Sequence, residues 1–300
     1  MSSHRRSQSR RLALAGAGQR GLVTDWIEFS AVDGPGNRFV VFLQGCGFDC
    51  LACHNPYTIN PCNDCGECLA SCPSGALQLD ALGHLTWNDA ACTGAGTCVS
   101  VCPHDSTPKA RRLTIEQVLE RIRPAAPFLS GITVSGGEAT RQALFLRELF
   151  LAVRADPALA RLTCFVDSNG DTNLPIWDLL TPVMDAAMID LKAFDPQVHR
   201  LLTAADNAKV LATIEHLAAL GKLHEVRLLM MPGHNDSDEQ VAATGRWLAG
   251  VDPTMRVKVI GFRHHGVRPT PVPLVEPTPA QLTHYRDVLA AHGDFRFVLV

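Results

Sequence analysis

The chain has 300 residues, of which 46% are hydrophobic and 19% are charged. This composition predicts a globular protein of one large or two smaller domains. The 27 Lys and Arg residues nearly balance the 30 Asp and Glu residues, so the formal net charge is -3. Such a balance supplies no field for general binding to nucleic acid or to a membrane surface. No apolar run approaches the roughly 18 residues of a membrane span, and none follows the basic N-terminus early enough to be the core of a signal peptide.

The N-terminal region divides into a tail and a pair of strands. Residues 1–21 are rich in Arg, Ser and Gly and lack sustained periodicity, so we expect a disordered basic tail, with a polyanion-binding arm as the alternative. From Thr24 to Leu43 the chain alternates as strands do, interrupted by the turn sequence DGPG at 33–36. The run RFVVFLQG predicts a buried strand that leads directly into the first cysteines.

Beyond residue 110, predicted strands and helices alternate to the end of the chain. Thr114 opens the first helix, because Gln117 completes a capping-box pattern, and this helix ends near Arg123. Later strands are expected at 131–135, 162–167, 186–191, 224–230, 256–261 and 295–300, and later helices at 141–154, 173–180, 208–219, 238–249 and 279–291. This alternation implies parallel βαβ units, which either close part of a barrel or form an open sheet. In both architectures a site forms at the carboxyl ends of the strands.

Eleven cysteines are the most informative feature of the composition. Ten of them lie between Cys46 and Cys102, whereas Cys164 lies among apolar residues and is expected to be a buried thiol. A disulfide scaffold would normally be a short secreted chain with its cysteines spread throughout. The crowding here indicates metal ligation in a reducing compartment, so we expect a cytoplasmic protein.

The first cysteine group is Cys46, Cys50 and Cys53, on the loop after the buried strand. Three thiolates at this spacing can bind three irons of a cubane cluster and leave the fourth iron without a protein ligand. An open iron can take a substrate, as an open coordination position does in catalytic metal sites. A zinc knuckle with His54 as the fourth ligand is the alternative.

Two further cysteine runs lie in the loop-like residues 54–109, and both end in Cys-Pro. Their spacing is that of bacterial ferredoxins, in which the last cysteine of each run ligates the other cluster, but Ala95 stands where the second run should have a ligand. A complete cluster is expected from Cys62, Cys65, Cys68 and Cys102. An incomplete site is left with Cys72, Cys92 and Cys98. We therefore expect an inserted ferredoxin-like iron–sulfur domain, whose incomplete site holds a three-iron cluster, a cubane completed by water or a side-chain oxygen, or no cluster.

Polar residues gather where the predicted parallel strands end. Two glycines in the segment Ser135-Gly136-Gly137-Glu138 let the backbone approach a ligand closely, and Glu138 adds a negative charge. Further groups at the ends of neighbouring strands would converge over the same opening, or alternatively form a surface salt-bridge set: Asp167, Asp190 and Lys192. Arg227 lies mid-strand among apolar residues, where its charge is costly unless it is paired.

The first cysteine group resembles the signature of the radical S-adenosylmethionine (SAM) superfamily. Together with the upstream VDGPGNR sequence at 32–38 and the ferredoxin-type insert, it resembles the activating enzymes of glycyl radical enzymes, and the resemblance is closest to the YjjW type. It covers residues 22–300 and implies an α/β fold, a partial (β/α)6 radical SAM barrel. In this arrangement the barrel comprises residues 22–53 and 110–300, and the ferredoxin-like domain is inserted at 54–109.

The resemblance also implies roles for the polar residues at the strand ends. Gly136, Gly137 and Glu138 correspond to the motif that holds the amino group of the SAM methionine moiety. Lys192 would make a positive contact to SAM or to the substrate loop, and Arg227 would meet the SAM carboxylate, to which a bidentate guanidinium is suited. A monovalent-cation site near SAM is implied for Asp167, Ser168, Met188 and Asp190.

The chain departs from the family pattern in two places. Many relatives carry an aromatic residue before the third cluster cysteine, against the SAM adenine, where this chain has Ala52. Phe48 and Tyr57 are the candidates to replace that contact. Relatives also place a histidine in a late segment where this chain has Phe262 followed by Arg263, so the SAM contact there is assigned to Arg263, His264 or His265.

The function that the resemblance implies is that of an anaerobic radical SAM oxidoreductase. It would reductively cleave SAM at a [4Fe-4S] cluster on Cys46, Cys50 and Cys53, with Lys192 as a further catalytic residue, and use the 5′-deoxyadenosyl radical to form a glycyl radical on a partner enzyme. The partners implied are that enzyme and a flavodoxin or ferredoxin-type electron donor, with no nucleic acid or membrane. Two alternatives remain: a radical SAM enzyme acting on a small molecule or peptide, and a non-enzymatic electron-transfer protein.

Overall fold

The computed structural model describes residues 18–270 and 272–300, so most of the predicted tail lies outside the described residues. The chain divides into two compact units. The first contains the described residues up to Ala31, then Gly36–Cys46 and Pro56–Leu162, and the second contains Val32–Pro35, Gly47–Asn55 and Thr163–Val300.

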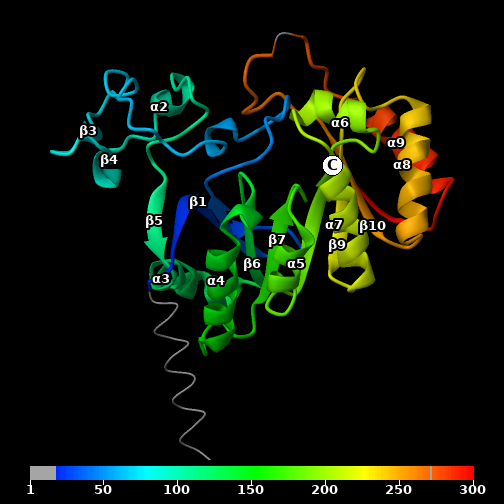
Figure 1. Cartoon of the computed structure of the whole chain (residues 1–300), viewed down its shortest axis with the longest axis horizontal. Helices are drawn as coiled ribbons and strands as arrows, with labels where there is room; N and C mark the ends of the chain where they lie inside the picture. Colours follow the sequence, from blue (N-terminus) through cyan, green and yellow to red (C-terminus); the bar gives the residue numbers. More distant parts are fainter. Residues whose placement is uncertain (1–17, 271) are drawn as a thin grey trace, which may run out of the picture. The chain divides into compact units, whose positions relative to one another are not determined.

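The first unit is built on four strands in the order β6-β2-β1-β5 (Figure 1). They are β1 (Arg20–Ser30), β2 (Arg38–Leu43), β5 (Arg111–Thr114) and β6 (Gly131–Gly136). Strand β2 pairs in parallel with β6, whereas β1 pairs antiparallel with β2 and β5. Because β1 begins at Arg20, the predicted tail is too long: its last two residues belong to this strand. The sequence also did not predict β5.

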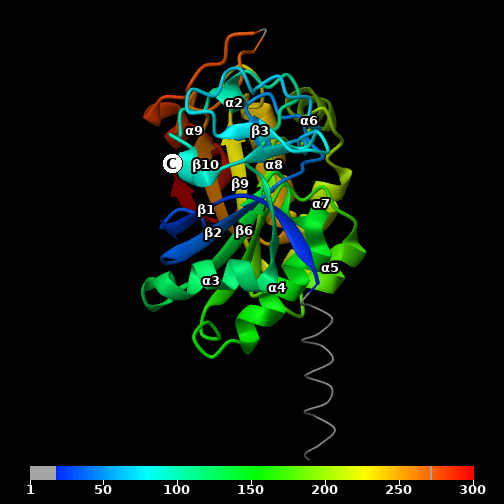
Figure 2. The same ribbon diagram turned by 90° about the vertical axis from the view of Figure 1, so that its left-hand side faces the viewer.

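Strand β2 is the core of this sheet, since Phe39, Val40, Val41 and Leu43 are each at most 1% exposed. Helices α3 (Ile115–Ala125) and α4 (Ala143–Ala155) lie side by side and contact β1 (Figure 2). The predicted capping box is confirmed: the Thr114 hydroxyl accepts from the Gln117 backbone N–H, and the Gln117 side-chain oxygen accepts from the Thr114 backbone N–H. Two short 3₁₀ turns, Ala126–Phe128 and Ala139–Gln142, connect these helices to the strands.

The residues between Pro56 and Ala110 contain little regular structure. They form the antiparallel hairpin of β3 (Leu77–Leu79) and β4 (Leu85–Trp87), the short helix α2 (Thr97–Ser100) and two 3₁₀ turns at Pro56–Thr58 and Asp89–Ala91. Their buried apolar cluster consists of Cys68, Leu77 and Cys98. Cysteines thus occupy positions that aliphatic side chains fill in most small domains.

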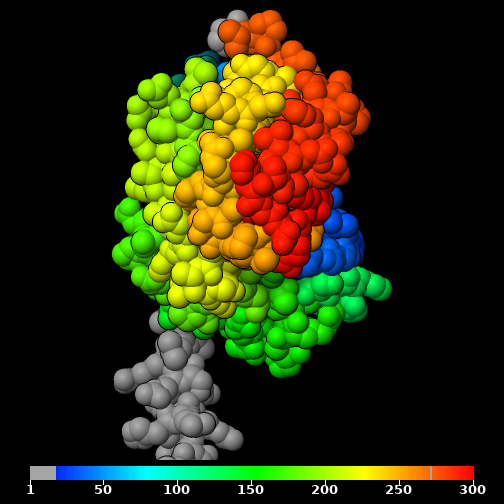
Figure 3. Space-filling view, turned by 90° about the vertical axis from the view of Figure 1, so that its right-hand side faces the viewer, coloured from blue at the N-terminus to red at the C-terminus, as the bar shows by residue number. Residues whose placement is uncertain are grey.

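The second unit is a parallel sheet in the order β11-β10-β9-β8-β7. Its strands are β7 (Thr163–Ser168), β8 (Ala186–Leu191), β9 (Leu223–Met230), β10 (Arg256–Gly261) and β11 (Arg296–Leu299). Its helices are α5 (Leu174–Leu180), α6 (Pro196–Thr203), α7 (Ala208–Ala219), α8 (Asp238–Val251) and α9 (Pro279–Ala290). Figure 3 shows α9 at the surface, packed beside α8. The predicted alternation of strands and helices is confirmed, apart from the missed helix α6.

Helix α6 is short, and its N-terminus is capped by Asp195. The Asp195 carboxylate accepts hydrogen bonds from the backbone of Gln197 (2.8 Å) and Val198 (3.0 Å), and Pro196 occupies the first turn. The last carbonyls of this helix accept from the cysteine loop: Thr203 from Asp49 (2.9 Å) and Leu202 from Leu51 (2.8 Å). Helix α6 is therefore a support of that loop.

We expect Asp195→Ala to lower the free energy of unfolding by about 1 kcal/mol, because two backbone N–H groups of α6 lose their acceptor. Urea unfolding followed by circular dichroism measures this change. Asp195→Ser is the matched control and should keep most of the stability, since serine also caps helices. Equal losses in both variants would contradict the capping role.

Candidate functional site

The start of the cysteine loop is fixed by the chain segment that returns after it. The Gln44 side chain is buried and donates to the carbonyls of Tyr57 (2.8 Å) and Asn60 (2.7 Å). The Gly45 backbone donates to Thr58 (2.8 Å), and that of Cys46 donates to Ile59 (2.9 Å). These bonds leave the half-buried Cys46 thiol on a backbone with little freedom to move.

The rest of the loop is held within the second unit. The Cys53 backbone donates to the Cys50 carbonyl (3.2 Å), and both thiols are half-buried. Ala52 packs with Leu202 and Phe262 in a buried apolar cluster. The backbone of the loop also donates hydrogen bonds to the carboxyl end of α6. The backbone groups of this irregular segment are thus hydrogen-bonded although it belongs to no helix or strand.

A segment after β10 also contacts the cysteine loop. Arg268 forms an ion pair with Asp49 and donates to the Cys50 carbonyl (3.3 Å). The Nε2 of His54 lies 3.0 Å from the Arg263 carbonyl and must donate to it, which leaves Nδ1 as the ring nitrogen with a free lone pair. Gly266 has φ +79°, and a Cβ there would lie 2.7 Å from the His54 carbonyl oxygen. Glycine is therefore required for this approach.

The residues proposed to contact the SAM adenine, and those proposed to contact SAM from the segment after β10, differ in exposure. Phe48 is 1% exposed and packs edge-on against His199, with ring centroids 5.4 Å apart, so its ring is not open to an adenine. Tyr57 is half-buried and remains the candidate. Arg263, His264 and His265 are exposed. Arg263 pairs with Glu276 (3.3 Å), which also accepts from the His264 backbone (3.0 Å).

Glycines 136 and 137 are required by the neighbouring backbone. Gly136 has φ +130°, and a Cβ there would lie 2.2 Å from backbone atoms of Leu43. A Cβ on Gly137 would lie 2.5 Å from the Gly45 carbonyl and 2.7 Å from the Thr58 carbonyl. The Glu138 backbone donates to the Gly45 carbonyl (2.7 Å), so this segment lies against the residue before Cys46. The sequence explained these glycines by a ligand, whereas the structure shows a protein contact that is sufficient to require them.

The Glu138 side chain is almost completely buried, with 2% of the residue exposed. Its carboxylate accepts hydrogen bonds from the Thr140 backbone (2.9 Å) and the Thr140 hydroxyl (2.7 Å). These bonds cap the 3₁₀ turn that follows and fix the carboxylate orientation.

Charged residues of β7, β8 and β9 form one buried network. Asp167 is in register with Met188, and Asp190 with Arg227, so the three strands bring these residues together. Arg227 donates to Asp167 (2.9 Å) and lies 2.9 Å from the Met188 sulfur. The side chains of Asp167 and Arg227 are 14% and 9% exposed, so this network is not a surface salt-bridge set. Ser168 is also buried, and its hydroxyl accepts from the Gly170 backbone (2.9 Å).

Glu225 is the member of the network that sequence reasoning missed. Its carboxylate accepts from Arg227 (2.8 Å) and Arg256 (3.0 Å), and the residue is 4% exposed. Although burial raises the pKa of Glu225, the two arginines outweigh it and leave that pKa below its usual range. An acid two residues before Arg227 points to the same face of the strand, which is the signal that could have identified it.

Lys192 is a positively charged ammonium group that acts on the cysteine loop. Its ammonium forms an ion pair with Asp190 (2.7 Å). Burial lowers the pKa of Lys192, but the negative charges of Asp190, Cys50 and Cys53 raise it by more. The pKa of Lys192 therefore lies above its usual range. The pKa of Asp190 moves downward, since Lys192 and Arg227 outweigh its burial.

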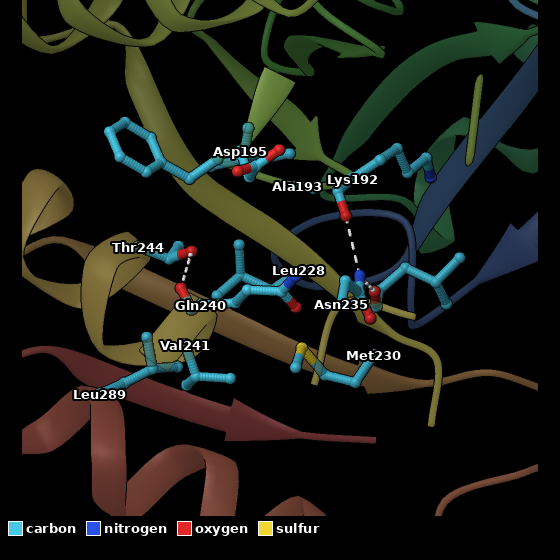
Figure 4. A pocket seen from close by; sticks show the side chains of 13 residues that line it. Lys192, Ala193, Asp195, Leu228, Met230, Asn235, Gln240, Val241, Thr244 and Leu289 are labelled. Atoms are coloured by element: carbon cyan, nitrogen blue, oxygen red, sulfur yellow. Dashed lines mark hydrogen bonds between the residues drawn. The ribbon is translucent and has the colours of Figure 1, made fainter. Parts of the chain in front are cut away.

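A small cavity on the other side of Lys192 is structural in character (Figure 4). The Asn235 amide donates to the carbonyls of Lys192 (2.8 Å) and Leu229 (2.7 Å), which holds the ends of β8 and β9 in place. Most of the other lining residues are apolar and include Val241 and Leu289. In Figure 4 the ammonium of Lys192 points away from Asn235, so this cavity does not take up its charge.

The seven cysteines between residues 60 and 110 line two separate cavities, in the two sets that their spacing predicts. One cavity is lined by Cys62, Cys65, Cys68 and Cys102. The other is lined by Cys72, Cys92 and Cys98, with Ala95 beside them. All seven are free thiols, and soft thiolate sets of this kind suit iron–sulfur clusters. The donor chemistry thus fits a four-ligand and a three-ligand cluster.

The fold and the cysteine groups define an α/β protein with three groups of cysteine thiols whose chemistry suits iron–sulfur clusters. Residues 40–244, more than half of the chain, match the family model of the radical SAM superfamily. The chain belongs to the radical SAM superfamily and, within it, to the activating enzymes of glycyl radical enzymes.

Curated relatives and a solved structure agree with this assignment. The pyruvate formate-lyase-activating enzyme of Streptococcus mutans is 30% identical over 82% of this chain and 79% of its own length. The indoleacetate decarboxylase activating enzyme of Tractidigestivibacter scatoligenes is 28% identical over 91% and 96%. QueE from Escherichia coli superposes with a TM-score of 0.56 over 96% of this chain and 97% of its own, at 12% identity, and shows the fold alone. Among the described residues, no helix is long and apolar enough to cross a membrane.

The first prediction from the site concerns Gly137. Gly137→Ala should lower the free energy of unfolding by about 1–3 kcal/mol, because the added methyl group overlaps two carbonyl oxygens at the start of the cysteine loop. Gly250→Ala in α8 is the control: its Cβ meets no atom within 4 Å, so it should be neutral or gain up to about 1 kcal/mol. Urea unfolding of the apo chain measures both changes, and a neutral Gly137→Ala would contradict the close approach.

The second prediction concerns pH and Glu225. A carboxylate whose pKa is lowered by folding contributes stability above its unfolded value, and this stability is lost as the pH falls through the folded value. We therefore expect Glu225→Gln to be less stable than wild type at pH 7 and to lose less stability below about pH 4.5. Urea midpoints between about pH 3 and 7 test this. Glu215→Gln, exposed on α7, should keep the wild-type pH dependence, and parallel curves for Glu225→Gln and wild type would refute the assignment.

Proposed function

We propose that the chain activates a glycyl radical enzyme, using a [4Fe-4S] cluster held by Cys46, Cys50 and Cys53. The observation that carries this proposal is a loop of three thiols whose backbone is fixed by hydrogen bonds. Bound there, the reduced cluster would supply the electron that cleaves SAM to methionine and a 5′-deoxyadenosyl radical, which takes a hydrogen atom from a glycine of the partner.

The chain's own residues would bind and orient SAM. Glu138, whose backbone donates to Gly45, is proposed to accept from the SAM amino group. Lys192 would offset the negative charge that three thiolates bring to the loop. Arg227 is proposed to meet the SAM carboxylate, although three of its contacts already go to protein atoms. It would therefore give up part of its bond to Asp167, or share it.

The remaining assignments are also part of this proposal. The cation site formed by Asp167, Ser168, Met188 and Asp190, and the contact to SAM from His265, rest on the resemblance. The two cavities lined by the later cysteines are proposed to hold clusters that relay electrons from a flavodoxin or ferredoxin-type donor. A cytoplasmic location and the closer likeness to the YjjW type remain predictions.

The test is an anaerobic assay for SAM cleavage. The full chain is reconstituted with iron and sulfide, reduced with dithionite and given SAM, and 5′-deoxyadenosine is measured. We expect product from wild type and from Cys164→Ala, a buried cysteine outside the three groups, and none from Cys50→Ala, since three protein ligands are already the minimum. Product from Cys50→Ala with its iron restored would refute the cluster assignment.

A second arm identifies the substrate class. The same mixture is incubated with purified glycyl radical enzymes of several types, and the glycyl radical is followed by electron paramagnetic resonance. A doublet that requires this chain and SAM supports activation. Formation of 5′-deoxyadenosine with no radical on any candidate would favour a small molecule or peptide as the substrate.

A further inference from the structure

The two cysteine-lined cavities differ in the charges that surround them. Among the described residues, the four-cysteine cavity is lined by the carboxylate of Glu67 and by no Lys or Arg side chain, and the imidazole of His104 lies near Cys65 and Glu67. Of the residues that the structure describes, Lys109 lines the three-cysteine cavity and no carboxylate does. The insert therefore surrounds one set of thiols with negative charge and the other with positive charge.

The indole of Trp87 adds a hydrogen-bond donor to the three-cysteine cavity. Its Nε1 is buried and has no hydrogen-bond acceptor at normal distance among the described residues, although the ring lines the cavity. A buried N–H without a protein acceptor in the wall of this cavity is available to the sulfur atoms of a cluster bound there.

The position of Trp87 is fixed by a stack of cations and rings. The Arg111 guanidinium lies 4.7 Å from the Trp87 ring centroid and 4.9 Å from that of Trp26. Lys109 lies 5.7 Å from the same Trp87 ring. Arg111 is also paired with Asp89 (3.0 Å), whereas Lys109 has no ion pair with any described carboxylate and itself lines the cavity.

The direction of the effect follows from the charge of the redox couple. Reduction adds a negative charge to an iron–sulfur cluster, so a nearby ammonium and N–H donors to sulfur favour the reduced form and raise the reduction potential. A nearby carboxylate has the opposite effect. A cubane held by three thiolates and a neutral water also carries one negative charge fewer than a cubane held by four thiolates.

We propose that, of the two clusters of the insert, the one held by Cys72, Cys92 and Cys98 has the higher reduction potential, and that Lys109 and Trp87 raise it. This inference rests on the proposed function for the presence of the clusters. A one-electron donor, itself oxidised by one electron, then reduces the three-cysteine site first. The four-cysteine cluster is left as the stronger reductant of the pair.

The test is a redox titration of the reconstituted full chain, followed by electron paramagnetic resonance with iron counted in each sample. Cys62→Ala and Cys72→Ala identify the two signals. We expect Lys109→Gln to shift the reduction equilibrium of the three-cysteine cluster about tenfold toward the oxidised form, which is about 59 mV for one electron. Trp87→Phe, which keeps the stack with Arg111, should shift it in the same direction.

Two matched variants separate charge from structure. Lys109→Arg should retain the wild-type potential, and Arg112→Gln, an equal charge change at an exposed position of β5, should leave both potentials unchanged. Equal or reversed potentials in wild type, or an unchanged potential in Lys109→Gln with full iron content, would overturn the inference. Iron found only on the first cysteine loop and in the four-cysteine cavity would also overturn it, while leaving the proposed cleavage of SAM intact.

Discussion

The candidate site depends on one constraint, that an irregular loop must carry three thiols without leaving buried backbone groups unpaired. Gly45 and Cys46 satisfy this through the returning segment at Thr58 and Ile59. Asp49 and Leu51 satisfy it through the carboxyl end of α6. The glycines at 136 and 266 follow from the same constraint, because each lies where another strand or loop approaches too closely for a side chain. The loop is thus held by backbone contacts that many sequences could make, and its chemistry resides in the cysteines.

The buried charges of β7, β8 and β9 are hard to explain by stability. Removing charges from water costs about as much as their pairing returns, so apolar side chains of similar volume would often serve the fold as well. Arg227 forms ion pairs with Asp167 and Glu225. Its presence in the buried sheet is therefore better explained by a need for positive charge at this site than by the stability of the fold. The same holds for Lys192, whose ammonium acts on the thiols of Cys50 and Cys53.

The sequence predicted what local pattern determines and missed what tertiary contacts determine. The helices at 115–125 and 208–219 have clear apolar periodicity or a capping box, whereas β5, with the sequence RRLT, is a short charged edge strand without alternation. Helix α6 has eight residues, which is too few for periodicity to reveal, and only Asp195-Pro196 indicated it. The contact that requires Gly137 lies with Gly45 and Thr58, far away in sequence, so no local pattern could show it.

The cysteines of the insert also take part in its packing. Its buried apolar cluster has only three members, two of which are Cys68 and Cys98. A domain of this size buries too little apolar surface to offset the entropy of ordering its loops. Metal–thiolate bonds supply that difference in small metal-binding domains, where binding free energy is folding free energy. The thiols of the three-cysteine cavity would then both ligate a cluster and hold the surrounding loops together. Lys109 and Trp87 would act on the reduction potential of a group that also stabilises their own part of the fold.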